Sequence, residues 1–319
     1  MAKAETAAPD ERQLSVVVPV YGCEGCLSEL HRRLTATLEA MNVSYELVFV
    51  DDRSPDGAWP LLLDLADGDA EHVQAVRLSR NYGQHAAITA GLAETRGRYV
   101  VVMDCDLQDP PEAIPRLYEQ ALAGFRVVFA RRKSRRHSWF RKLAARCYFV
   151  LVRIFTGVRV NGEYGSFSLI ERRVVNAYLR LRDRGRHYLF ILYWLGFDST
   201  EIEVEHGERG AGESSYSLGR LLNHALQGVF FQTTRLLRWI VYLGFFVALA
   251  GVVFAAYLVY RAMVSHPYPG WTSLAVLILL IGGMIITSIG VTGLYIEQIF
   301  DQVKDRPLYV IDERAGDAR

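Results

Sequence analysis

The chain has 319 residues, of which 51% are hydrophobic and 22% are charged, and its formal net charge at pH 7 is +1. Together with this charged fraction, a mean hydropathy of +0.10 excludes a purely soluble enzyme. The composition predicts a soluble catalytic part joined to a membrane part.

Residues 1–13 are polar and small, and we expect a disordered lead-in there rather than a signal peptide. Strand and helix patterns then alternate. We predict strands at 14–20, 45–50, 72–78, 99–103 and 127–130, and helices at 27–41 and from about residue 84. Regular β-α alternation predicts a doubly wound, mostly parallel sheet, in which ligands bind at the carboxyl ends of the strands.

Two carboxylates follow the buried strand at 99–103. In an extended chain Asp104 and Asp106 point the same way, and Gln108 follows at the same spacing. Their oxygens are suitable ligands for Mg²⁺ or Mn²⁺, and a metal of this kind usually also binds a substrate diphosphate. The alternative is a strand that ends in a solvated acidic turn. Polar pairs at Asp51-Asp52 and Arg80-Asn81 also follow predicted strands, which favours a site.

Other motifs, present or absent, limit the kinds of nucleotide and metal site that the chain can form. No Gly-x-Gly-x-x-Gly follows the first strand and no Walker-type phosphate loop is present, so a nucleotide diphosphate would have to be held through a metal. The Cys23-Glu-Gly-Cys26 spacing lacks a second pair of ligands, and we expect all four cysteines to be reduced cytosolic thiols.

A basic block extends from 131 to 162, where ten Lys or Arg residues occur without any Asp or Glu. It requires an anionic partner: nucleic acid, a lipid phosphate or lipid headgroups. Within and after this block, amphipathic patterns near 139–156 and 218–236 predict interfacial helices with basic side chains at the headgroups. The alternative for each is an amphipathic helix packed on the domain.

Two uncharged stretches, 239–260 and 271–296, are long enough to cross a bilayer and have aromatic residues at their ends. We predict a transmembrane hairpin at 238–298 rather than two buried core helices. Lys and Arg flank the outer ends of both spans, whereas the short loop has only Arg261. The preceding domain (14–237), the tail (299–319) and both termini should therefore be cytoplasmic in a multi-pass inner-membrane protein.

Five motifs carry a resemblance to a known family. They are Val17-Val-Pro-Val-Tyr21, Val50-Asp-Asp-Arg-Ser-Pro-Asp-Gly57, Leu78-Ser-Arg-Asn-Tyr-Gly83, Met103-Asp-Cys-Asp-Leu-Gln-Asp-Pro-Pro-Glu112 and Arg209-Gly-Ala-Gly-Glu-Ser-Ser-Tyr216. With the predicted hairpin, they resemble the membrane-bound family 2 glycosyltransferases of the GT-A fold. Within these, they are similar to polyprenyl-phosphate glycosyltransferases related to dolichol-phosphate mannose synthase.

The resemblance implies a role for each site residue. The nucleotide sugar would contact Pro19, Tyr21, Glu24, Asp51, Asp52, Arg80, Asn81 and Gly83. The metal would be held by Asp104, Asp106 and Gln108, and the acceptor phosphate by Arg132, Ser134 and Arg135. Arg209 would close over the donor, and Glu163 is a candidate base. In two departures from the family pattern, Gly22-Cys23 follows Tyr21 in place of Asn-Glu, and Ser166 replaces an aspartate.

The implied activity is a metal-dependent, inverting hexosyl transfer from a nucleotide sugar, with uracil as the expected base, to undecaprenyl or another polyprenyl phosphate. The product would serve cell-envelope glycan or lipid modification. The alternatives are a processive polysaccharide synthase of family 2 and a non-catalytic membrane scaffold. The former is disfavoured because Leu236 stands where the processive Gln-x-x-Arg-Trp signature requires Trp. Related enzymes suggest a homotetramer, and no nucleic acid partner is expected.

Overall fold

The computed structural model describes residues 12–132, 164–183, 186–205 and 270–316, together with isolated helical positions between 242 and 264. The chain divides into two compact units. One consists of Met1–Phe149, Val158–Tyr216 and Pro307–Arg319, and the other of Val150–Gly157 and Ser217–Arg306.

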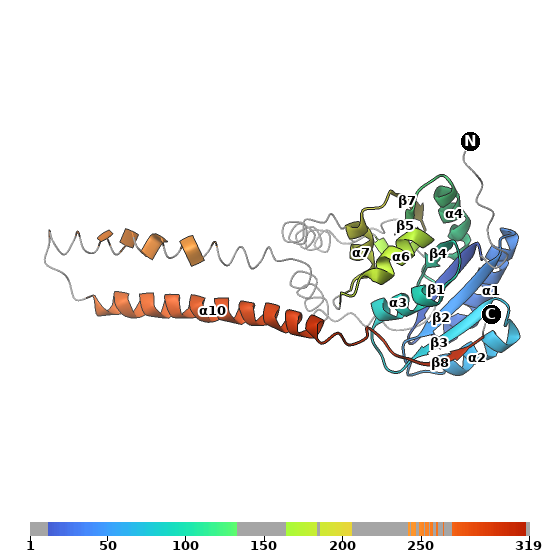
Figure 1. The fold of residues 1–319 in the computed structure, drawn as a ribbon, viewed down its shortest axis with the longest axis horizontal. Coiled ribbons are helices and arrows are strands. Elements are labelled where there is room, and N and C mark those ends of the chain that lie inside the picture. Colours follow the sequence, from blue (N-terminus) through green and yellow to red (C-terminus); the bar gives the residue numbers. More distant parts are fainter. Residues whose placement is uncertain are drawn as a thin grey trace. The chain divides into compact units, whose positions relative to one another are not determined.

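Within the described residues, the first unit is built on one mixed sheet of eight strands in the order β7-β5-β6-β4-β1-β2-β3-β8 (Figure 1). The strands are β1 (Leu14–Val20), β2 (Tyr45–Asp51), β3 (Val73–Leu78), β4 (Tyr99–Val102), β5 (Val127–Arg132), β6 (Tyr164–Glu171), β7 (Ser199–Val204) and β8 (Ile311–Ala315). The pairs β1/β2, β2/β3, β1/β4 and β5/β7 are parallel, while β6 runs antiparallel to β4 and β5, and β8 to β3.

Helices cover both faces of the sheet (Figure 1). They are α1 (Glu24–Ala40), α2 (Ala58–Gly68), α3 (Gln84–Glu94), the short 3₁₀ helix η1 (Pro111–Ala113), α4 (Ile114–Leu122), α6 (Arg172–Arg180) and α7 (Tyr188–Leu195). Side chains of α1, α2 and α4 share one apolar core with alternate strand residues such as Val16 and Val18. Those of α3, α6 and α7 share a second core with the intervening residues, such as Val17. This alternation follows from the two-residue period of a strand that is buried on both faces.

The predicted doubly wound, mostly parallel sheet is confirmed, and the five predicted strands match β1 to β5 to within two residues at each end. Helix α1 begins three residues earlier than predicted because its first turn is polar and gives no hydrophobic period. The C-terminal strand β8 lies within 299–319, where the sequence predicts only a tail. Its residues Asp312, Glu313 and Arg314 are charged, and such a stretch does not read as a strand.

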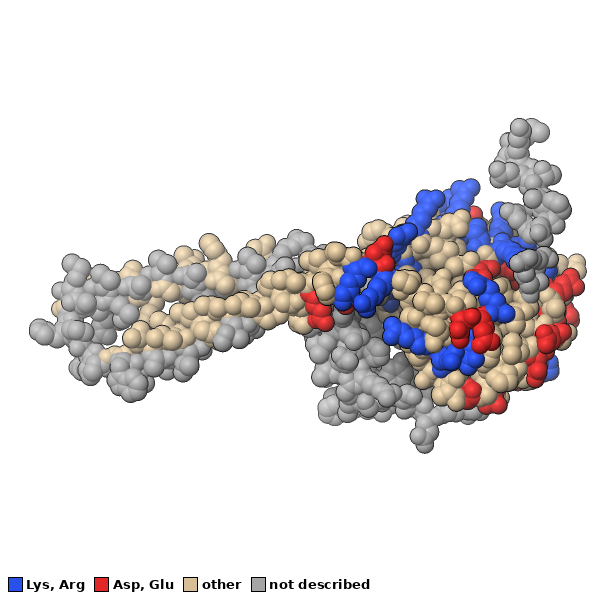
Figure 2. Space-filling model, turned by 60° about the horizontal axis from the view of Figure 1, so that its bottom comes forward, with Lys and Arg blue, Asp and Glu red and all other residues tan. Residues whose placement is uncertain are grey.

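The second unit contains helix α10 (Trp271–Val303), which includes the predicted span 271–296 and extends past it. Among the described residues it is the one helix long and apolar enough to cross a membrane, over Ile281–Val303. Large apolar side chains such as Ile285, Ile289 and Ile296 are exposed along it. In Figure 2 its described surface is nearly free of charged side chains, whereas the sheet unit carries many.

The other predicted membrane elements are not tested. Span 239–260 is described only at isolated positions, which are helical and include the exposed Phe245 and Phe246. The interfacial helices predicted near 139–156 and 218–236 lie outside the described residues.

Close packing of α3 on the sheet leads to a prediction for Gly91. A Cβ atom at this position would lie 2.4 Å from Cγ1 of Val17 and 3.1 Å from Cγ2 of Val50. We expect Gly91→Ala to lower the free energy of unfolding by about 1–3 kcal/mol through overpacking. Gly68→Ala on α2 is the matched control, since a Cβ there meets nothing within 4 Å. Denaturant unfolding of the full chain in detergent micelles measures both, and equal stability of the two variants would contradict this packing.

Candidate active site at the carboxyl edge of the sheet

The carboxyl ends of β1, β2, β3 and β4 lie at one edge of the sheet because these four strands are parallel. The chain places β2 and β3 on one side of β1 and then β4 on the other. The order in which the chain adds strands therefore reverses at β1. Loops that leave β1 and β4 diverge at this point, and open α/β sheets bind ligands there. The polar residues predicted as a site therefore belong to one edge.

Asp52 shapes the loop after β3. Its carboxylate accepts hydrogen bonds from the backbone N–H groups of Tyr82 (2.7 Å, to Oδ1) and Gly83 (2.8 Å, to Oδ2). Gly83 has φ +92°, a conformation that glycine adopts without steric cost. Burial raises the pKa of Asp52, and the two N–H donors oppose this effect. Its contacts fix the backbone that leads from β3 into α3.

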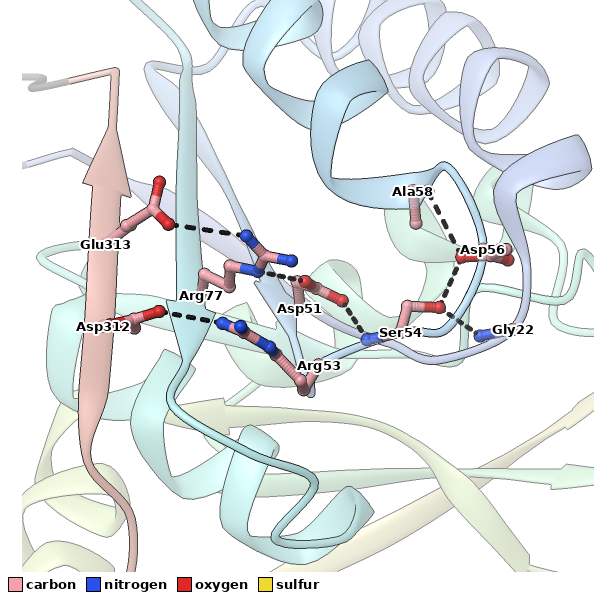
Figure 3. A network of polar contacts seen from close by, with 9 residues as sticks. All are labelled: Gly22, Asp51, Arg53, Ser54, Asp56, Ala58, Arg77, Asp312 and Glu313. Carbon is pink, nitrogen blue, oxygen red and sulfur yellow. Dashed lines mark hydrogen bonds and ion pairs between the residues drawn. The ribbon is translucent and has the colours of Figure 1, made fainter.

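Asp51 is fully buried at the end of β2. Its Oδ1 accepts the N–H of Ser54 at 2.8 Å, and the hydroxyl of Ser54 accepts the N–H of Gly22 at 2.7 Å. Burial raises the pKa of Asp51, while the Ser54 amide and the nearby Arg77 lower it. Through Ser54, the loop after β2 is attached to the loop after β1 (Figure 3).

Asp104 joins β4 to two other segments. Its Oδ1 accepts hydrogen bonds from Nε2 of Gln84 (2.6 Å) and from the hydroxyl of Ser166. Because β6 runs antiparallel to β4, its first residues lie beside the carboxyl end of β4, which explains the approach of Ser166. Neither partner was predicted. Ser166 was noted only as a departure from the family motif, and Gln84 only as a helix start.

The premise that residues 104–108 are extended is wrong. Strand β4 ends at Val102, residues 105–107 form bends, and Leu107 has φ +62°. The N–H of Gln108 donates to Oδ1 of Asp106 at 3.1 Å across this turn. Within the described part of the chain, no group of three or more His, Cys, Asp or Glu side chains is arranged to hold a metal ion.

A disulfide joins Cys23, after β1, to Cys105, which lies between the two aspartates. The expectation that all four cysteines are reduced is wrong for this pair. Their separation of 82 residues gives no sign of it, but the parallel pairing of β1 with β4 brings their Cα atoms to 6.5 Å. Cys26 is free and buried, and Cys147 lies outside the described residues.

These contacts connect the four loops into a ring. Hydrogen bonds join the loop after β2 to the loop after β3 (Asp52 with Gly83), and α3, which follows that loop, to the loop after β4 (Gln84 with Asp104). The disulfide Cys105–Cys23 joins the loop after β4 to the loop after β1, and the hydrogen bond between Gly22 and Ser54 joins the latter to the loop after β2. Four separate segments of the chain are thus held at fixed positions around one edge, which suits recognition of a ligand with several parts.

The other predicted nucleotide contacts also lie at this edge. Pro19 is buried near the end of β1. Tyr21, the first residue after that strand, is 52% exposed. The Glu24 carboxylate accepts the N–H of Gly57 at 2.9 Å, so it holds the start of α2. Arg80 is exposed with its guanidinium 4.7 Å from the centre of the Tyr82 ring, and Oδ1 of Asn81 accepts the N–H of Gly83 at 3.1 Å.

The predicted acceptor site is only partly described. Glu163, Ser134, Arg135 and Arg209 lie outside the described residues, and of Arg132 only the backbone at the end of β5 is described. The neighbouring Arg131 forms ion pairs with Glu201 (3.0 Å) and with Glu203 on β7. These two glutamates are exposed, because they lie on the outward-facing positions of β7, which alternate with the buried Ile202 and Val204.

A surface hollow of about 430 Å³ lies elsewhere. It is lined by Glu29, Arg32, Arg33, Ala36, Thr37 and Glu112. None of the predicted site residues lines it, and its charged side chains already form the ion pairs Arg32–Glu29 and Arg33–Glu112. We therefore place the candidate site at the strand ends.

The fold and this edge define an α/β protein with a candidate ligand site at the carboxyl ends of parallel strands, and comparison with known proteins identifies its family. Residues 15–179 match Glycosyl transferase family 2, and the chain belongs to that family. The GT-A fold expected from the resemblance is confirmed by this membership together with the observed topology.

Relatives match over nearly the whole chain. An undecaprenyl-phosphate 4-deoxy-4-formamido-L-arabinose transferase of Pseudomonas fluorescens is 39% identical over 94% of this chain and 89% of its own length. A protein of the same name from Sodalis glossinidius is 37% identical over 94% and 93%. An uncharacterized glycosyltransferase of Synechocystis is 32% identical over 95% and 96%.

Among solved structures, the glucosyl-3-phosphoglycerate synthase of Mycobacterium tuberculosis, crystallised with Mn²⁺, UDP-glucose and phosphoglyceric acid, superposes with a TM-score of 0.48. The sequences of the two proteins are 17% identical, and the matched region covers 69% of this chain and 78% of the synthase chain.

The disulfide gives a direct prediction. In protein purified without reductant and then denatured, iodoacetamide should alkylate Cys26, whereas Cys23 and Cys105 should react only after reduction. Peptide mass spectrometry measures this. Cys105→Ser is the matched control, since it should free Cys23 for alkylation without reductant. Reduction should also lower the free energy of unfolding by about 2–4 kcal/mol. Alkylation of all four cysteines before reduction would contradict the bond.

Proposed function

We propose that this glycosyltransferase moves a sugar from a nucleotide diphosphate, with UDP as the expected carrier, to the phosphate of undecaprenol or another polyprenol. The observation that carries the proposal is the identity of 37–39% over 94% of the chain to two transferases named for undecaprenyl phosphate. The ring of loops around Asp51, Asp52 and Asp104 supplies contacts for the donor. The long apolar helix α10 supports a lipid acceptor.

The donor set at Asp104, Asp106 and Gln108 fits a divalent cation such as Mg²⁺ or Mn²⁺. All three side chains are half-buried and offer hard oxygen atoms. Phosphate oxygens and water would complete the coordination, as is usual for Mg²⁺. Such an ion would act as a Lewis acid on the departing diphosphate. Gln84 and Ser166 orient the Asp104 carboxylate for this role.

The acceptor requires positioning more than activation. A phosphate monoester has a second pKa near ~6, so at neutral pH it is already largely anionic and needs no strong base. The basic block that includes Arg132, Ser134 and Arg135 would hold this phosphate, with Glu163 a minor candidate as base and Arg209 over the donor. Direct displacement by the phosphate oxygen would invert the anomeric carbon. In this proposal the product serves envelope modification.

We place the enzyme at the cytoplasmic membrane. The exposed apolar side chains of α10 support a membrane location. By the positive-inside rule, the distribution of Lys and Arg favours a cytoplasmic catalytic unit with both termini on the same side. The two-span hairpin and the homotetramer suggested by the resemblance stay predictions. Disulfides are rare in the reducing cytosol, so on this side Cys23 and Cys105 would exchange with cellular thiols.

The first test is product formation. Membranes containing the full chain, incubated with undecaprenyl phosphate and a panel of nucleotide sugars, should yield one undecaprenyl-phosphate sugar detected by lipid mass spectrometry. Membranes without the chain are the control. If a water-soluble polysaccharide formed instead, the processive synthase would be the correct alternative, and absence of any transfer would favour the scaffold.

The second test concerns the carboxylates. We expect Asp104→Asn and Asp106→Asn each to lower turnover at least about 100-fold, as removal of comparable electrostatic stabilisation does. Each should also weaken binding of Mn²⁺ measured with the nucleotide by calorimetry. Asp64→Asn, which changes an exposed carboxylate on α2, is the matched control and should leave both unchanged. Wild-type turnover and Mn²⁺ binding in either site variant would refute the assignment.

A further inference from the structure

The Cys23–Cys105 disulfide connects the proposed metal site to the start of α1. Cys105 stands directly between Asp104 and Asp106, the two carboxylates proposed to hold the ion. Since both aspartates are its chain neighbours, the position of Cys105 determines where both carboxylates begin. The bond is therefore a covalent link between the donor site and a different element of the sheet unit.

The turn that carries these carboxylates has an unfavourable backbone. Strand β4 ends at Val102, residues 105–107 form bends, and Leu107 has φ +62°, a left-handed conformation that is unfavourable for a residue with a side chain. Such conformations persist where neighbouring segments hold them. Hydrogen bonds from other segments hold the carboxylate of Asp104, and the disulfide holds the next residue, Cys105. The shape of the turn thus depends on its attachments.

The other end of the bond is firmly attached. The N–H of Gly22 donates to the hydroxyl oxygen of Ser54 at 2.7 Å, and the N–H of Glu24 donates to Oδ2 of Asp56 at 3.0 Å. The Ser54 hydroxyl in turn donates to Oδ1 of Asp56 (Figure 3). Both neighbours of Cys23 are therefore bound to the loop after β2, and the backbone at Cys23 is a fixed anchor for the turn.

The strands below these loops are held without the disulfide. Strands β1 and β4 pair in parallel up to Val17 and Val102, and apolar cores cover both faces of the sheet. Loss of the bond would leave this pairing in place and would free only the loops that follow the two strands. These loops carry the proposed metal ligands. The consequence of the bond in the folded protein therefore falls on the site.

We propose that the Cys23–Cys105 bond positions the turn that carries Asp104 and Asp106, so that affinity for the metal-bound donor nucleotide depends on the oxidation state of this pair. This inference rests on the proposed function, because it assumes a nucleotide and a divalent cation at this edge. With the bond intact, the turn is preorganised for the ion. Without it, the turn samples other conformations, and the apparent affinity falls with the populated fraction of the productive one.

The bond breaks by thiol–disulfide exchange. Two molecules of a small thiol such as glutathione supply two electrons and two protons to Cys23 and Cys105, and they are themselves joined in a disulfide. The reverse reaction, with glutathione disulfide as oxidant, forms the bond again. Each cysteine is 8% exposed, so neither is fully enclosed. Because the cytosol keeps thiols reduced, oxidising conditions would tighten donor binding.

The test measures nucleotide binding to the purified full chain in detergent with Mn²⁺. Calorimetry with UDP, GDP, CDP and dTDP first identifies which of the four the oxidised wild type binds best. Reduction with a phosphine, removed before titration and verified by alkylation, should raise the Kd for that nucleotide about tenfold, as when the productive turn is about 10% populated. The KM for the nucleotide sugar should rise similarly, while the KM for polyprenyl phosphate stays unchanged. A general structural defect would change both.

Serine variants make the same change without a reductant. Cys23→Ser and Cys105→Ser should each raise the Kd about tenfold, and the double variant should raise it no further, because all three lack the same bond. Reduction should leave the Kd of these variants unchanged. Additive effects of the two single substitutions would mean that each cysteine acts separately, and they would overturn the role of the bond.

Cys26→Ala is the matched control. Cys26 lies in the first turn of α1, where it is buried and free. The variant should keep the Kd of the oxidised wild type and the tenfold response to reduction. Loss of that response would assign the effect to Cys26 and would overturn the inference.

The outcomes separate this inference from the proposed function. If the oxidised wild type binds a nucleotide, and the reduced protein and the serine variants bind it equally well, the positioning role of the disulfide is wrong, while the proposed function stands. If the wild type binds none of the four nucleotides, the proposed function is wrong and the inference falls with it.

Discussion

Parallel pairing of β1 with both β2 and β4 determines where the rest of the site lies. It places the loops after these strands at one edge, with the reversal of strand order at β1. The disulfide, the Asp52 contacts with the β3 loop and the Asp104 contacts with Gln84 and Ser166 all depend on this arrangement. Helices on both faces bury the strands, so the edge is set by the apolar core.

Buried charge is balanced differently at neighbouring positions on this edge. Asp52 binds two backbone amides, which compensate for its burial and fix a loop. Asp51 binds one amide and faces a guanidinium that makes no hydrogen bond with its second oxygen. The positive charge of Arg77, 3.3 Å away, compensates instead for the burial of the Asp51 carboxylate. Two adjacent aspartates therefore differ in role because of what surrounds them.

Hydrophobic runs were sufficient to predict β1 to β5 and the parallel sheet, since long buried strands give a strong signal. The residues Asp51, Asp52 and Asp104 were also placed correctly at strand ends. The Cys23–Cys105 bond and the Gln84 and Ser166 contacts were missed because they depend on which strands become neighbours, which spacing along the chain does not encode. The bend at Leu107 was missed because a left-handed conformation at leucine has no sequence signal. The charged strand β8 was missed because its partner β3 is distant.

The position of β8 has a consequence for biogenesis. Arg77 and Glu313 are 236 residues apart, and α10 is made between them. At about 5–20 residues per second, a ribosome needs roughly 10–50 seconds to supply the last strand after β3 emerges. Until then β3 is an open sheet edge, which is prone to pairing with other chains. Completion of the sheet is thus coupled to completed translation and follows synthesis of the apolar helix α10, so truncated products lack a finished sheet.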